Sequence, residues 1–280
     1  MASLVAETWI QATALVETPL GKTGTGFFVK RDIREDEGFI FLITNKHVIG
    51  NDRIERDSVD HLWLTLNVDK GGKTVAGRYR YSGIASCTIE HPDEDVDVLA
   101  IDVTTLIGAL RDHRVKWTNY DQFANRRILR DEDITQAEEV MILGYPAGLQ
   151  QGQTAYPLVR QGIIASRIGE RTAVPQEAGP PKLLPAFYID GGIVPGSSGS
   201  PVVLKPVGIR RKHGSLVVGE TTPWLLGIVS TTLHVAVGDP GQQFRSLAGL
   251  GLAFDSDEIR KTIEAYPPIL AAQAAQSKSR

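Results

Sequence analysis

The sequence has little cysteine, no long apolar run and no large excess of charge of either sign. Its one cysteine, Cys87, cannot form a disulfide within the chain, and we interpret it as a small buried residue. No run of about 18 apolar residues is present, and the first residues lack the basic segment of a signal peptide. The formal net charge is −3, so neither nucleic acid nor an anionic membrane is expected as a partner. These absences together predict a cytoplasmic protein.

Metal-binding motifs are also missing. The chain contains neither His-Glu-x-x-His nor Cys-x-x-Cys, so no metal and no other cofactor is predicted. Five of the 6 histidines are interpreted as surface or loop residues, namely His61, His91, His113, His213 and His234.

The composition is that of a globular protein with a large core. Of its 280 residues, 42% are hydrophobic and 22% are charged. Short apolar runs of strand length recur along the chain, whereas helical periodicity is rare. The sequence therefore predicts an all-β protein made of a pair of barrels. We expect an N-terminal barrel over residues 1–120, a C-terminal barrel over residues 121–254, and a C-terminal helix and tail over residues 255–280.

Several segments carry more specific expectations. Val5–Val16 has the apolar content of a strand. Glu170–Pro185 contains four prolines and little periodicity, which predicts a long loop. Asp255 is placed to cap a helix that runs to about Ala265, and the tail Ala271–Arg280 is expected to fray.

A serine between glycines is the first candidate for chemistry. The stretch Asp190–Val203 reads DGGIVPGSSGSPVV and places Ser198 after Gly196-Ser197 and before Gly199. Glycines at these positions allow a sharp turn that exposes the hydroxyl and gathers backbone N–H groups. A serine becomes a nucleophile when a base takes its proton and such donors receive the developing negative charge. The alternative is an ordinary surface turn rich in glycine and serine.

A base and a residue to orient it occur earlier in the chain. His47 follows the apolar run Phe39–Thr44, which is expected to be a buried strand. Asp97 immediately precedes the apolar run Val98–Ile101. His47 could also be a hydrogen-bonded core residue, and Asp95 is the one serious rival to Asp97. The order His, Asp, Ser differs from that of α/β-hydrolases, in which serine comes first, and from that of subtilisins, in which aspartate comes first.

Five motifs in this order resemble the trypsin-like (chymotrypsin-fold) serine peptidases, most closely the HtrA/DegP-like bacterial branch. They are Gly24-Thr25-Gly26-Phe27-Phe28-Val29, Thr44-Asn45-Lys46-His47-Val48, Asp97-Val98-Leu99-Ala100-Ile101, Gly144-Tyr145-Pro146-Ala147-Gly148-Leu149 and Asp190–Pro201. The resemblance implies two packed six-stranded antiparallel β-barrels with the active site between them. It further implies a catalytic triad of His47, Asp97 and Ser198, with an oxyanion hole formed by the backbone N–H groups of Gly196 and Ser198.

The chain departs from this family at several points. Ser200 replaces the usual second glycine and should crowd the entry to the following strand. Ser197 stands where trypsin-type zymogens have an aspartate, which argues against activation by cleavage at the N-terminus. A regulator acting on the loop over residues 170–185 is expected instead. No PDZ domain is expected after the second barrel.

The substrate is expected to be a protein or peptide. By the family register, Gly192 and Ile193 lie at the base of the primary specificity pocket, and Ser230, Thr231 and Thr232 lie along its wall. No acidic residue occurs there, which favours a small or apolar substrate side chain over arginine or lysine.

The function predicted from these residues is that of a serine endopeptidase. Two alternatives remain open: a catalytically silent, peptidase-like module that binds peptides, and an esterase that uses the same triad. The oligomeric state is not predicted.

Overall fold

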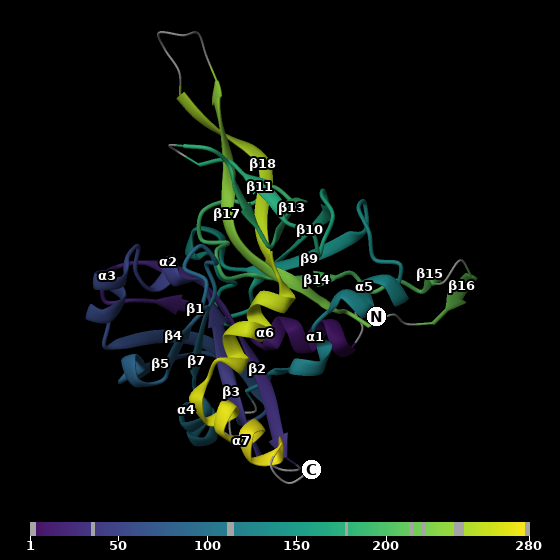
Figure 1. Cartoon of the computed structure of the whole chain (residues 1–280). Coiled ribbons are helices and arrows are strands. Elements are labelled where there is room, and N and C mark those ends of the chain that lie inside the picture. Colours follow the sequence, from purple (N-terminus) through teal and green to yellow (C-terminus); the bar gives the residue numbers. More distant parts are fainter. Residues whose placement is uncertain are drawn as a thin grey trace.

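The computed structural model describes residues 4–34, 37–110, 115–176, 179–212, 215–219, 222–237 and 244–277. Most of the regular structure in these residues is β-strand, arranged as two lobes that pack against each other (Figure 1).

The first lobe is an eight-stranded sheet. Its order is β5-β4-β1-β2-β3-β7-β6, and β8 pairs with β2 in parallel. The strands are β1 (Thr13–Glu17), β2 (Thr23–Arg34), β3 (Glu37–Thr44), β4 (His61–Lys70), β5 (Lys73–Ser82), β6 (Thr88–Glu90), β7 (Leu99–Asp102) and β8 (Thr118–Asn119).

The second lobe is a closed barrel in the order β10-β13-β18-β17-β14-β9. Its strands are β9 (Glu139–Gly144), β10 (Leu158–Ile164), β13 (Ala186–Asp190), β14 (Pro201–Leu204), β17 (Leu225–Val237) and β18 (Phe244–Asp255). The same half of the chain also contains two separate two-stranded hairpins. One is formed by β11 (Thr172–Val174) and β12 (Lys182–Leu184), and the other by β15 (Ile209–Lys212) and β16 (Ser215–Val218).

Helices lie at the ends of the chain and in the connections between strands. They are α1 (Leu4–Gln11), α2 (Lys46–Ile49), α3 (Arg53–Ser58), α4 (Thr104–Ala109), α5 (Arg126–Asp131), α6 (Ser256–Glu264) and α7 (Pro267–Ser277). Within the described part of the chain, none of them has the length and apolar character needed to span a membrane.

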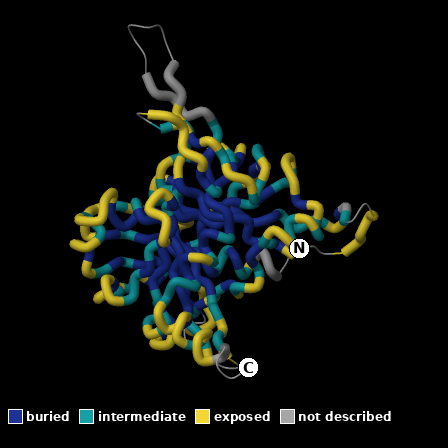
Figure 2. The backbone as a smooth tube through the Cα atoms, in the orientation of Figure 1, coloured by how far each residue is buried: buried dark blue, intermediate teal, exposed yellow. Residues whose placement is uncertain are grey.

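The core is shared between the lobes, and Figure 2 shows the buried segments gathered in the centre of the molecule. One apolar cluster joins Phe27 and Phe41 of the first sheet to Val203, Leu225 and Phe254 of the second. The surface where the lobes meet is therefore a packed interior. It holds their loops, including those that carry the candidate site, in fixed relative positions.

The predicted fold class is confirmed: the chain is mostly β, with a closed six-stranded barrel and a C-terminal helix. The first lobe differs in detail, because it has eight strands rather than six. The prediction of a strand over Val5–Val16 is wrong in its first half, which forms α1. There Trp9 is fully buried, and Glu7 accepts a hydrogen bond from Gln11 one helical turn later.

The other local expectations are corrected in part. The described part of Glu170–Pro185 is not a bare loop but the β11–β12 hairpin. The tail expected to fray is helical in α7 as far as Ser277. Asp255 does precede a helix, α6, as expected, although its side chain does not cap it.

Candidate active site

His47 and Asp97 lie in direct contact. Strand β3 ends at Thr44, and the chain turns into the short helix α2, which contains His47. His47 Nδ1 lies 2.6 Å from Asp97 Oδ2, and the backbone N–H of His47 donates to Asp97 Oδ1 at 3.2 Å. An ionised carboxylate only accepts hydrogen bonds, so Nδ1 carries the proton and Nε2 keeps a lone pair that can accept another. This is the tautomer that a general base requires.

The loop that contains Asp97 is also bonded to Asn45, two residues before His47. The side-chain amide of Asn45 donates to the backbone carbonyl of Asp97 at 2.6 Å. Asp95, the rival candidate, instead contacts the ammonium of Lys182 on β12. The structure therefore places Asp97, and not Asp95, beside the imidazole.

Ser198 lies in a turn between β13 and β14 that depends on glycine. Gly196 and Gly199 have φ values of 87° and 85°, in the left-handed region. A Cβ at Gly199 would lie 1.8 Å from the carbonyl oxygen of Thr25, so no larger residue fits there. The turn is held against β2, where the N–H of Thr25 donates to the carbonyl of Ser198 at 2.8 Å.

The hydroxyl of Ser198 donates to the backbone carbonyl of Ser230 at 2.9 Å. Within the described residues it makes no hydrogen bond to His47. The Ser230 hydroxyl donates in turn to Asp97 Oδ2 at 2.7 Å. Ser230 therefore contacts both Asp97 and Ser198, and it links the Ser198 hydroxyl to the His47–Asp97 pair.

Ser230 was expected to line the substrate pocket, and its contact with Asp97 was not foreseen. The pairing of β17 with β18 shifts register between Val229 and Thr231, which leaves Ser230 outside the regular ladder. Such an irregularity re-aims a side chain. A serine at the end of an apolar run was the one sequence signal, and it does not specify a partner.

Along residues 196–199 of the turn, backbone N–H groups without a hydrogen-bond acceptor alternate with N–H groups that have one. Those of Ser197 and Gly199 donate to the carbonyls of Val194 and Val229 at 3.1 and 2.9 Å. Those of Gly196 and Ser198 have no acceptor among the described residues. Backbone N–H groups without an acceptor in the described part of the chain are the kind of donor that an oxyanion would need.

The residues assigned to the specificity pocket differ in how far they are buried. Ile193 is 2% exposed and packs in the core of the second barrel, because its apolar side chain fills the space above Gly251. Its assignment to the base of the specificity pocket stays a prediction. Gly192 and Thr231 are exposed and Thr232 is half-buried. The guanidinium of Arg160 donates to the carbonyl of Gly192.

The crowding expected from Ser200 is relieved by a glycine opposite. Ser200 is fully buried, and a Cβ at Gly144 of β9 would lie 2.0 Å from its hydroxyl oxygen. The side chain of Ser200 occupies the space that Gly144 leaves open.

The remaining histidines differ in their surroundings. His91, expected on the surface or in a loop, is 6% exposed, and its Nε2 lies 3.0 Å from Glu258 Oε2. His91 lies in the loop between β6 and β7, in agreement with the expectation of a surface or loop residue, and it is covered by α6. His113 and His213 lie outside the described residues. The described residues contain no group of three or more His, Cys, Asp or Glu side chains placed to hold a metal ion.

Residues 24–206 match the trypsin-like peptidase domain family. Because the match covers more than half of the chain, the protein belongs to this family and is a trypsin-like serine peptidase. The resemblance read from the five motifs is thereby confirmed at the level of the family. No curated protein sequence matches the chain significantly.

Solved structures share the fold at low sequence identity. The Rv3671c protease of M. tuberculosis in its inactive form has a TM-score of 0.52 and 17% identity, over 95% of this chain and 93% of that chain. Its active form has a TM-score of 0.51 and 16% identity, over 94% of this chain and 84% of that chain. Deg5 has a TM-score of 0.51 and 16% identity, over 92% of this chain and 90% of that chain. These likenesses concern the fold alone.

Proposed function

We propose that the protein is a serine endopeptidase that hydrolyses peptide bonds through an acyl-enzyme. The observation that carries the proposal is the contact between His47 and Asp97, joined through Ser230 to the hydroxyl of Ser198. The proposal is supported by a histidine bonded to a carboxylate, a hydroxyl held between glycines, and two backbone N–H groups of the same turn that have no acceptor among the described residues. Each of these parts performs one task in acyl transfer.

The reaction begins when the Ser198 hydroxyl rotates from the Ser230 carbonyl toward His47 Nε2. The rotation gives up one hydrogen bond, whose net contribution is about 0.5–1.5 kcal/mol, so the observed orientation is a small barrier to reactivity. Nε2 then accepts the hydroxyl proton while Oγ attacks the substrate carbonyl carbon. Asp97 stabilises the imidazolium, and the N–H groups of Gly196 and Ser198 bind the oxyanion.

The second half of the reaction returns the same proton. His47 donates it to the departing amine as the carbon–nitrogen bond breaks, which leaves an ester on Ser198. Water, deprotonated by His47, then attacks this ester, and His47 returns the proton to Ser198 Oγ as the carbon–oxygen bond breaks and the acid is released.

The substrate preference is proposed to be for a small or apolar side chain. No acidic residue occupies the positions assigned to the pocket, and the guanidinium of Arg160 lies against Gly192. A positive charge at this place disfavours an arginine or lysine substrate side chain. The exposed part of β17 after Ser230 offers main-chain groups to an extended peptide.

Regulation is proposed to act on the β11–β12 hairpin. Lys182 of this hairpin contacts Asp95, and Val174 and Leu184 share an apolar cluster with Val96 and Val98. A ligand that shifts the hairpin would therefore move the loop that carries Asp97. Limited proteolysis within residues 170–185 should change the activity, and unchanged activity would count against this route.

A fluorophosphonate probe tests the proposed function. The wild type should be labelled and Ser198→Ala should not, and cleavage of fluorescent casein should fall by roughly 10⁶-fold in Ser198→Ala. Ser197→Ala, one residue away, serves as the matched control and should remain labelled. Labelling without cleavage of casein or of a peptide library would favour an esterase. Absence of labelling in the wild type would favour a silent binding module.

A further inference from the structure

Lys46 stands immediately before His47, yet its side chain is buried. The residue is 6% exposed. Its ammonium nitrogen lies 3.4 Å from the carbonyl oxygen of His91, 3.2 Å from that of Asp93 and 3.5 Å from that of Glu94. An ammonium group has three hydrogens to donate and no acceptor, so three carbonyls match its bonding capacity.

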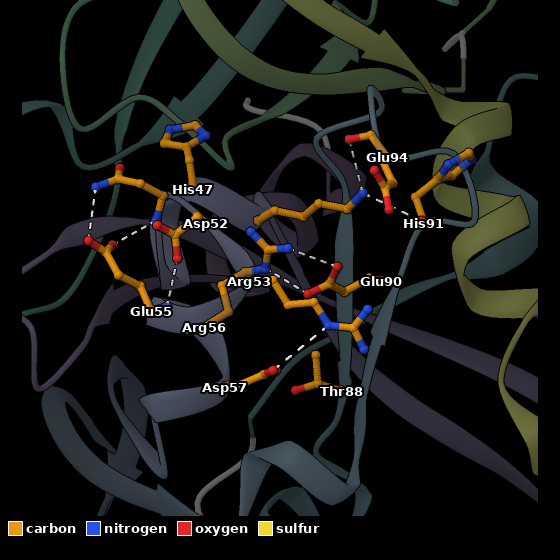
Figure 3. A network of polar contacts seen from close by, with 12 residues as sticks. His47, Asp52, Arg53, Glu55, Arg56, Asp57, Thr88, Glu90, His91 and Glu94 are labelled. Atoms are coloured by element: carbon orange, nitrogen blue, oxygen red, sulfur yellow. Dashed lines mark hydrogen bonds and ion pairs between the residues drawn. The ribbon is translucent and has the colours of Figure 1, made fainter.

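All three carbonyls belong to the loop between β6 and β7, which also carries Asp97. Figure 3 shows His91 and Glu94 on this loop, with the dashed contacts that reach their carbonyls. The start of the loop is held independently. Arg56 of α3 binds Glu90 at 2.6 and 3.0 Å (Figure 3). His91 contacts Glu258 of α6.

Three consecutive residues that follow β3 hold this loop. Asn45 binds the carbonyl of Asp97, Lys46 binds the carbonyls of residues 91, 93 and 94, and the N–H of His47 binds Asp97 Oδ1. Both partners of the His47–Asp97 contact are therefore positioned through the segment that contains Lys46. A displacement of about 1 Å between such groups can cost on the order of 100-fold in rate.

Burial of a charged ammonium at this position costs free energy, because the group loses its contact with water. Burial lowers the pKa of Lys46, and the carboxylates of Glu90, Asp97 and Asp93 act against that shift. A buried charge is weak evidence of a stabilising role, because an apolar side chain of similar volume often serves stability as well or better. The three hydrogen bonds that Lys46 donates to the β6–β7 loop account for an ammonium group at this position.

We infer that Lys46 is a positioning residue for catalysis: through the carbonyls of His91, Asp93 and Glu94 it sets the loop so that Asp97 meets His47. The inference rests on the proposed function. Lys46 itself touches neither substrate nor reacting atoms, so its whole effect passes through Asp97.

The rate of inactivation by a fluorophosphonate probe tests this inference. Lys46→Met keeps the length of the side chain and removes its donors. Its maximal inactivation rate should fall roughly 10- to 100-fold with little change in the probe concentration at half-saturation. In the Asp97→Asn background the same substitution should change the rate less than about twofold, because the contact it serves is already lost. Lys205→Met, which removes an ammonium bonded to Glu139 in the second lobe, is the matched control and should match the wild type.

The outcomes separate the possible failures. An unchanged rate in Lys46→Met, an effect on half-saturation alone, or an equal loss in both backgrounds overturns the inference while the proposed function stands. A wild type that is not labelled contradicts the proposed function and this inference with it. If Lys46→Met does not fold, Lys46→Gln, which keeps an amide donor, undergoes the same two-background comparison with the same criteria.

Discussion

Two serines of the same turn differ in their hydrogen bonding. The hydroxyl of Ser198 donates to the Ser230 carbonyl, whereas that of Ser200 is buried and has no partner among the described residues. A buried hydroxyl without a partner loses its interaction with water and gains nothing in return. The side chain of Ser200 fits here because Gly144, which has no side chain, leaves room for it.

This fit predicts a compensating pair of substitutions. Gly144→Ala should lower the free energy of unfolding by about 1–3 kcal/mol, because the new Cβ would lie 2.0 Å from Ser200 Oγ. Gly144→Ala combined with Ser200→Gly should recover part of the loss, and only part, because Thr25 Oγ1 remains 2.8 Å from the same Cβ. Urea unfolding of the two single variants and the double variant measures this coupling. Strict additivity of the two effects would show that the residues do not share the space.

At the scale of elements, α6 connects the end of the second barrel to the first lobe. Asp255 stands immediately before it and accepts a hydrogen bond from the N–H of Gly169 at 3.2 Å. Further along, Glu258 is buried against His91, and Lys261 donates to its carboxylate at 2.7 Å. Burial opposes ionisation of Glu258, but its hydrogen bonds with His91 and Lys261 outweigh that effect and lower its pKa.

Asp255 should make stability depend on pH. Burial raises its pKa to about 7 from the ordinary 3.8. Its carboxyl is therefore protonated in the folded chain at pH values where the unfolded chain has lost the proton. This contribution is complete below about pH 4 and is lost as pH rises toward 7, at up to about 1.4 kcal/mol per pH unit. Asp255→Asn, which cannot ionise, should therefore gain stability relative to the wild type over this range.

Urea unfolding at several pH values between 4 and 8 measures the difference between the two proteins, in which the contributions of the other groups cancel. Asp257→Asn, two residues along α6 and less deeply buried, is the comparison variant and should show a smaller dependence. A constant difference between wild type and Asp255→Asn across the range would contradict the assignment.

At the scale of the molecule, both ends of the chain tie the lobes together. Trp9 of α1 is fully buried beside Phe27 of the first sheet, and its indole N–H donates to the carbonyl of Pro223, just before β17, at 3.2 Å. At the other end, α6 reaches the first lobe through Glu258, and α7 follows it past β2 and β3 (Figure 1). The site between the lobes therefore depends on segments far from it in sequence.

Substitution of Trp9 tests this dependence. Trp9→Ala should lower the free energy of unfolding by about 3–5 kcal/mol through the cavity it leaves. Trp9→Phe, which keeps most of the apolar contact and loses the N–H donor, should cost about 1 kcal/mol plus a smaller packing loss. Trp224→Phe, at a half-buried position, is the control and should cost less than Trp9→Phe. Urea unfolding of the three variants gives the order, and a cost for Trp9→Ala below that of Trp224→Phe would contradict the proposed tie.

The sequence by itself predicted a catalytic triad from short motifs. His47, Asp97 and Ser198 stand at the ends of apolar runs or between glycines, and these local patterns specify both a residue and its backbone setting. The class of fold followed in the same way, from many short strands in two halves. Local interactions are enough for such predictions because the neighbours along the chain determine them.

Only the tertiary structure decided which distant groups meet. The contact of Ser230 with Asp97, the hold of Lys46 on the loop and the room that Gly144 leaves for Ser200 join residues between 45 and 133 positions apart. The helical state of α1 also depends on the burial of Trp9 against the rest of the molecule, which outweighed a strand-like composition. Packing brings such groups together within each lobe and between the two lobes, and no pattern of neighbouring residues encodes the pairing.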